Sequence, residues 1–226
     1  MWHSSFSPSA ARQPCCSRSE PLREWLTRPC ARVSSPWATR RRREHPAFDR
    51  LSSRRRSCWG DVTSQYAYWL MQTHPDCEVR NKCVGGERSD QVRARFERDV
   101  IDTEPAVVVL IAGVNDVYQG RREAQVVEQL AWMYQRAAEA GIWVIAYNHS
   151  LQHRTPEHAQ MREINSWIRR RAEAEARLEF VDTRSAVAAP ANPDMLSETA
   201  NQLHPSPVGY RAMTGVIRPG LERILP

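Results

Sequence analysis

Residues 106–117 read AVVVLIAGVNDV, and they constrain the fold more than any other stretch of the chain. The Val-rich apolar run is too short to cross a membrane and predicts a β-strand that is buried on both faces. It ends abruptly in the polar residues Asn115 and Asp116. Open α/β sheets carry their binding and catalytic groups at the carboxyl ends of parallel strands. We therefore expect Asn115 to belong to a functional site.

Strand and helix patterns alternate from residue 59 onward. We expect strands at 77–84, 106–112, 143–147 and 178–182, and helices at 64–72, 89–99, 122–140, 156–176 and 208–225. Helical segments between short Val-rich strands predict a parallel sheet with helices on both faces. The chain contains neither a GxGxxG nor a GxxxxGK[ST] motif, which argues against dinucleotide and P-loop nucleotide binding.

The first quarter of the chain has a different character. Residues 1–58 contain thirteen Arg and four acidic residues, a formal charge of +9, which leaves −3 for residues 59–226 out of the total of +6. This segment is rich in Arg, Ser and Pro and has no period of 2 or 3.6. We expect a disordered basic segment at 1–58 and one folded domain at 59–226. A shifted reading frame upstream of about residue 58 would also account for the lack of pattern.

Several classes of protein receive no support from the sequence. Four of the six Cys lie within residues 1–58 and no CxxC pair occurs, so we expect neither a metal site nor a cofactor. No secretory signal is visible and no segment is long enough to span a bilayer, so we expect a cytoplasmic protein. The Arg runs at 40–43 and 54–56 could bind nucleic acid, but they have no folded scaffold, and we expect no nucleic-acid partner.

Three polar clusters fall at predicted strand ends or in the loops that follow them. They contain Gly86, Asn115 and His204, and each is weak evidence alone. A backbone N–H at Gly86 and the side-chain amide of Asn115 are suitable donors to a developing oxyanion. His204 is a candidate general base for a serine hydroxyl. Together the three residues predict one convergent site.

The same segments resemble sequence blocks of the SGNH hydrolases, also called the GDSL esterase/lipase family. NKCVGGERS at 81–89, VVVLIAGVNDV at 107–117 and LHPSPVGY at 203–210 resemble the second, third and last blocks. NSWIRRRA at 165–172 resembles the late helix of the family. The resemblance implies a flavodoxin-like three-layer αβα sandwich and hydrolysis of ester or acyl bonds in a small-molecule substrate through an acyl-serine. It gives Gly86 and Asn115 the role of oxyanion-hole donors and His204 that of catalytic base.

The first block of the family, an apolar strand ending in Gly-Asp-Ser, has no counterpart in this chain. Gly60-Asp61-Val62 is similar to it, but Val62 stands in the place of the nucleophile. Val62 also lies nearer to Asn81, the first residue of the second block, than the usual spacing of the family allows. Counting back by the usual spacing of the family leads to Ser52, which lacks a preceding Gly-Asp and an apolar strand. Ser52 is the best-placed nucleophile candidate, ahead of Ser53, Ser57 and Ser64.

Asn201 is the second departure from the family pattern. The family has Asp three residues before the catalytic His, where the carboxylate orients the imidazole and stabilises its cation. Asn201 stands at that position here and cannot supply the negative charge. Two functions therefore stay open: a serine esterase, and a catalytically inactive binding module that has kept the fold.

Overall fold

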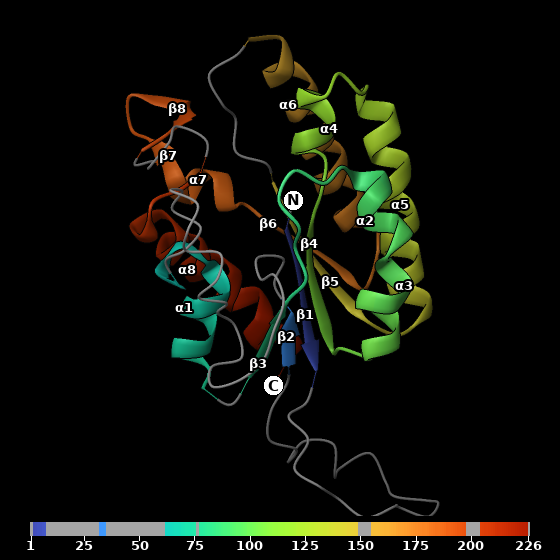
Figure 1. Cartoon of the computed structure of the whole chain (residues 1–226). Coiled ribbons are helices and arrows are strands. Elements are labelled where there is room, and N and C mark those ends of the chain that lie inside the picture. The colour runs from blue at the N-terminus through green and yellow to red at the C-terminus, as the bar shows by residue number, and fades with distance from the viewer. Residues whose placement is uncertain are drawn as a thin grey trace, which may run out of the picture.

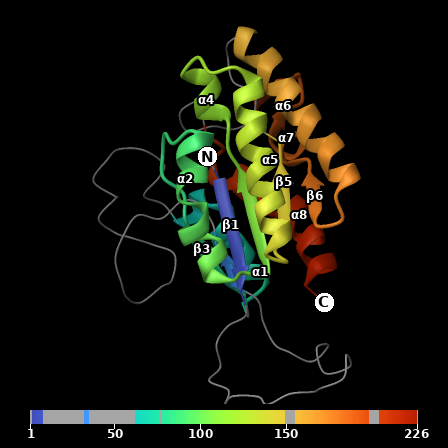
Figure 2. The ribbon, with the colours of Figure 1, turned by 90° about the vertical axis from the view of Figure 1, so that its right-hand side faces the viewer.

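The computed structural model describes residues 2–7, 32–34, 62–75, 77–148, 155–197 and 204–225. A central sheet runs between two layers of helices, which gives the three-layer αβα sandwich expected from the sequence (Figures 1 and 2). A separate small hairpin joins β7 (Ala188–Ala189) to β8 (Asn192–Leu196). The fold therefore matches the α/β class that the alternating pattern predicted.

The main sheet is organised around β4 (Val107–Ile111), which is buried at every position. On one side β5 (Trp143–Tyr147) pairs parallel with β4, and β6 (Leu178–Val181) pairs parallel with β5. On the other side lies β3 (Glu78–Asn81), shorter than the strand expected there. The strand order is β1-β3-β2-β4-β5-β6, with a further pairing between β1 and β4.

Two segments from the first 58 residues pair with the facing edges of β3 and β4. β2 (Arg32–Ser34) is parallel to both strands, whereas β1 (Trp2–Ser7) is antiparallel to both. The sequence predicted no regular structure here, so these strands, and the antiparallel direction of β1, differ from the expectation. The physical reason is that the N–H and C=O groups of β3 and β4 require partners, and a backbone of any sequence can supply them.

The helices follow the expected order, with some changes at their ends and two short additions. Their bounds are α1 (Tyr66–Thr73), α2 (Ser89–Ala94), α3 (Phe96–Asp99), α4 (Val114–Tyr118), α5 (Glu123–Glu139), α6 (Thr155–Ala174), α7 (Thr183–Val187) and α8 (Pro207–Ile224), and 3-10 turns cover Val62–Ser64 and Ile101–Thr103. The single helix expected at 89–99 is broken at Arg95 into α2 and α3. The sequence pattern predicted neither α4 nor α7.

The two faces of the sheet bury separate cores. Val108 and Leu110 of β4 pack with residues of α2, α3, α5 and α6, while Val107, Val109 and Ile111 pack with residues of α1 and α8. This division follows from the alternation of side chains along a strand. Figure 1 shows the two sets of helices on opposite sides of the sheet. Both faces of β4 are therefore apolar, and its polar neighbours are confined to the strand end.

The start of helix α8 packs closely against the segment that leads into it. Pro207 occupies its first turn, and the Ser206 hydroxyl accepts a hydrogen bond from the Gly209 N–H at 3.2 Å. A Cβ at Gly209 would lie 2.8 Å from the Pro205 Cβ, whereas a Cβ at Gly215 in the same helix would meet nothing within 4 Å. Gly209 therefore permits the close approach of the segment that contains Pro205.

The two glycines of α8 give a matched stability test. We expect Gly209→Ala to lower the free energy of unfolding by about 1–3 kcal/mol, because the rigid Pro205 ring must move. We expect Gly215→Ala to raise it by up to about 1 kcal/mol, because Ala favours the helix and the space is open. Urea unfolding followed by circular dichroism measures both. Equal effects of the two substitutions would contradict the close packing at Pro205.

Candidate functional site

Asn115 lies in the short helix α4, directly beyond the carboxyl end of β4. It is the second residue of that helix and is half-buried. The sequence placed Asn115 at the strand end, and the structure adds a helical turn that begins at Val114. Its amide is therefore carried on a helix that starts within three residues of the central strand.

Gly86 lies in a tight turn after β3. The Glu87 N–H donates to the Val84 carbonyl at 3.4 Å, so Gly86 occupies the third position of the turn. Its φ of +81° is in the left-handed region that side chains disfavour, and the residue is exposed. Glycine is the residue that such a turn favours at this position.

Hydrogen bonds bring the Gly86 turn and α4 together. The Asn115 side-chain amide donates to the Glu87 carbonyl at 2.9 Å, and the Gln119 amide donates to the Gly86 carbonyl at 3.2 Å. An asparagine amide carries two N–H groups, so this bond occupies one of them and leaves the second for another acceptor. Gly86 and Asn115, two of the residues predicted from the sequence, are thus close in space, although about thirty residues separate them in the chain.

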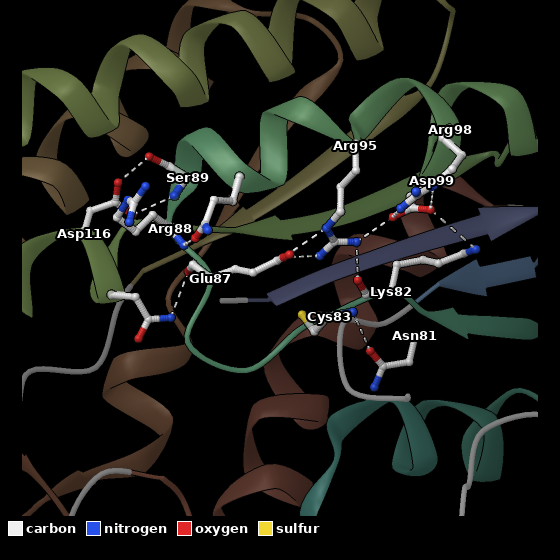
Figure 3. Close-up of polar contacts among 12 residues, drawn as sticks. Asn81, Lys82, Cys83, Glu87, Arg88, Ser89, Arg95, Arg98, Asp99 and Asp116 are labelled. Atoms are coloured by element: carbon white, nitrogen blue, oxygen red, sulfur yellow. Dashed lines mark hydrogen bonds and ion pairs between the residues drawn. The ribbon is translucent and has the colours of Figure 1, made fainter. Parts of the chain in front are cut away.

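The Asp116 carboxylate of α4 also binds the start of α2, directly after the Gly86 turn (Figure 3). It is fully buried and accepts hydrogen bonds from both the backbone N–H and the hydroxyl of Ser89, each at 2.7 Å. Arg121 Nη1 lies 3.7 Å from Asp116 Oδ1 and 2.8 Å from Asp90 Oδ1. A buried carboxylate with two donors and a nearby cation fixes the start of α2 against α4.

His204 lies just ahead of α8 and is half-buried. Burial is the largest cause of a fall in the pKa of His204 to about 4. Desolvation disfavours the charged imidazolium, so the ring is neutral at ordinary pH. A neutral imidazole nitrogen can accept a proton, which is what a general base requires.

The remaining predicted residues, Ser52 and Asn201, lie outside the described residues. Ser64, one of the minor nucleophile candidates, is only 7% exposed and lies in the turn before α1. Cys83 is also buried, and burial raises the pKa of its thiol. A thiol that resists deprotonation is a poor nucleophile, so the described cysteine nearest the Gly86 turn in sequence does not substitute for a serine.

The described parts of the chain contain no group of three or more His, Cys, Asp or Glu side chains arranged to hold a metal ion. No helix among them is both long and apolar enough to cross a membrane.

Sequence reasoning missed the residues that hold the site together. Asp116 stands beside Asn115 in the sequence, but its contact with Ser89 was not predicted. These two residues are 27 positions apart, and no local pattern links them. Gln119 lies one helical turn beyond Asn115, at a spacing that places both side chains on the same face of α4. That spacing is the signal from which Gln119 could have been found.

Comparison with known proteins gives a consistent result. Residues 49–212 match the model of the GDSL-like Lipase/Acylhydrolase family, a range that includes Ser52, Gly86, Asn115, Asn201 and His204. A search of curated proteins found no match.

Solved structures share the fold. A GDSL-like lipase from Bacteroides thetaiotaomicron is 26% identical, with 71% of this chain and 85% of that chain covered and a TM-score of 0.60. A putative lipolytic protein of the G-D-S-L family from Desulfitobacterium hafniense is 22% identical, covering 74% and 91%, with a TM-score of 0.60. A catalytic mutant of an acetylxylan esterase from Geobacillus stearothermophilus is 21% identical, covering 75% and 84%, with a TM-score of 0.58.

Proposed function

The chain belongs to the GDSL-like lipase/acylhydrolase family, and from this premise we propose that it hydrolyses an ester of a small molecule through an acyl-serine intermediate. The observation that carries the proposal is the bond from the Asn115 amide to the Glu87 carbonyl at 2.9 Å. It ties Asn115 to the residue that follows Gly86, so the two predicted oxyanion donors lie close together. The acyl and alcohol parts of the substrate are left open by this argument.

Gly86 and Asn115 would stabilise the negative charge that develops on the carbonyl oxygen of the substrate. The Gly86 N–H and the second N–H of the Asn115 amide are the proposed donors. Donors that are already fixed before the reaction stabilise a developing oxyanion without reorganising. The bonds from Asn115, Gln119 and Ser89 supply this fixation, because they hold the turn and α4 in one arrangement.

His204 would act as the base and Ser52 as the nucleophile. The Ser52 oxygen attacks the carbonyl carbon while its proton moves to the His204 ring. The tetrahedral intermediate then collapses, the ester C–O bond breaks, and the alkoxide leaves with the proton from His204. Water, deprotonated by His204, attacks the acyl-serine. The bond between the acyl carbon and the Ser52 oxygen then breaks, Ser52 takes the proton from His204, and the carboxylic acid is released. The family match begins at residue 49, so Ser52 and the other candidates Ser53, Ser57 and Ser64 all lie within it, and the family spacing is what favours Ser52.

Asn201 determines how fast we expect this hydrolysis to be. In serine proteases the corresponding Asp-to-Asn change costs about 10⁴ in rate, because the amide holds the imidazole in the wrong tautomer, and an amide also cannot supply the negative charge that stabilises the imidazolium. Burial lowers the pKa of His204 to about 4, so a charged imidazolium is disfavoured at this position. We therefore expect a slow esterase. The Asn201 sequence departure also favours the alternative, an inactive binding module, and the kinetic test below separates the two.

Hydrolysis of p-nitrophenyl acetate by the full chain tests the proposed roles. We expect His204→Ala and Ser52→Ala each to lower kcat/KM by at least about 100-fold, and Asn115→Ala to lower kcat by about 100-fold. His74→Ala is the matched control, since this histidine lies at the end of α1 beside Glu222 and should leave the rate unchanged. Equal rates for wild type and His204→Ala would reject the esterase and support the binding module.

The pH profile tests the state of His204. Only the neutral ring accepts a proton, so activity falls as pH drops through the pKa of His204, which is about 4. We expect the acid limb of kcat/KM near that value, well below the ordinary pKa of about 6.5. In Asn201→Asp the new carboxylate should stabilise the imidazolium, which moves the limb upward and raises kcat by at least about tenfold. An acid limb that stays at the same pH in Asn201→Asp would contradict this pairing.

A further inference from the structure

Arg95 occupies the break between α2 and α3, where the sequence predicted an unbroken helix. Its φ and ψ of −116° and 7° depart from helical values. In Figure 3 its side chain extends from this break toward Glu87 and Lys82. The side chain is only 12% exposed. Arg95 is thus turned inward against the segment that carries Gly86.

The Arg95 guanidinium joins both ends of the Gly86 turn. Nη1 donates to the Lys82 carbonyl at 2.6 Å, at the start of the segment. Nε and Nη2 donate to Glu87 Oε2 at 3.0 and 2.5 Å, at its end. Residues 82 and 87 are therefore held to one rigid, planar group, which limits how far the turn between them can move.

Asp99 holds Arg95 in this position. Arg95 Nη1 donates to Asp99 Oδ2 at 2.6 Å, and Lys82 Nζ lies 3.9 Å from Asp99 Oδ1. Burial would raise the pKa of Asp99, but hydrogen bonds from Arg98 and Arg95 offset this and lower it. Because its pKa is lowered in the folded chain, the Asp99 carboxylate is charged at every pH above its ordinary pKa. Its contribution to the stability of the fold is lost only as pH falls from that ordinary value through the lowered one.

Arg95 and α4 hold opposite sides of the same turn. Asn115 and Gln119 bind the carbonyls of Glu87 and Gly86, while Arg95 binds the Glu87 side chain. The bonds from α4 fix the peptide planes, and Arg95 fixes the ends of the segment. Neither set alone restrains all of residues 82–87.

We infer that Arg95 is a positioning residue that clamps the Gly86 turn so that the Gly86 N–H points to the oxyanion. This inference rests on the proposed function. Arg95 does not touch the substrate and acts through Gly86. A displacement of about 1 Å at a reacting group costs roughly 100-fold in rate, so a clamp of this kind affects turnover strongly.

Arg95→Lys and the matched control Arg98→Gln test the clamp in the full chain. Lysine keeps the charge but cannot reach Lys82, Glu87 and Asp99 together. Arg98 binds the same Asp99 carboxylate but is 73% exposed, and among the described residues its side-chain hydrogen bonds go to Asp99 and not to the turn. We expect hydrogen exchange of the amides at 86–89 to become at least about tenfold faster in Arg95→Lys and to stay at the wild-type rate in Arg98→Gln. Unchanged exchange of the β4 amides verifies that the fold is intact.

Turnover of p-nitrophenyl acetate separates positioning from a merely structural role. We expect Arg95→Lys to lower kcat about 10- to 100-fold with KM nearly unchanged, because the oxyanion contact exists only in the transition state. In the double variant that combines Arg95→Lys with Gly86→Ala, the loss in kcat should be well below the product of the two single-variant losses. Glu87→Gln, a milder change, should show a smaller loss of the same kind.

Two results would overturn the clamp. One is wild-type exchange at 86–89 in Arg95→Lys, and the other is a pair of kcat losses that multiply independently. A wild-type chain without turnover would instead refute the proposed function. In that case the exchange rates at 86–89 still decide whether Arg95 clamps the turn.

Discussion

The buried carboxylate of Asp116 is the contact on which the candidate site depends. It accepts two hydrogen bonds from Ser89 and so joins the turn after β3 to the helix after β4. A buried charge is costly unless it is paired and hydrogen-bonded, and here both conditions are met. This contact holds the segments of Gly86 and Asn115 together, and the arrangement of the proposed oxyanion donors follows from it.

The central sheet determines where the polar groups of this contact can lie. β4 is buried at every position because the two helix layers cover both its faces, so the polar groups can lie only at its end. β1 and β2 satisfy backbone groups of β3 and β4, the two strands that lead into the site. The site therefore depends on the segments that pair with these two strands, although neither segment carries a recognisable motif.

Much of the fold could be predicted from pattern alone, since β4, β5 and the long helices follow directly from apolar periodicity. The adjacency of Gly86 and Asn115 followed from the rule that parallel strands end at one edge of a sheet. Three features were not predictable in this way. The break at Arg95 depends on the conformation of one residue, the Asp116–Ser89 contact is long-range, and β1 and β2 pair through backbone groups that leave no side-chain signature. Ser52 and Asn201 stay predictions.

Covalent labelling of the full chain with a fluorophosphonate, followed by mass spectrometry of its peptides, tests the acyl-serine chemistry most directly. The probe forms a stable adduct only with a serine that a base has activated and an oxyanion hole supports. We expect an adduct at Ser52, with labelling slowed strongly in His204→Ala and Asn115→Ala. An unmodified protein, or labelling at the same rate in all three proteins, would contradict this expectation.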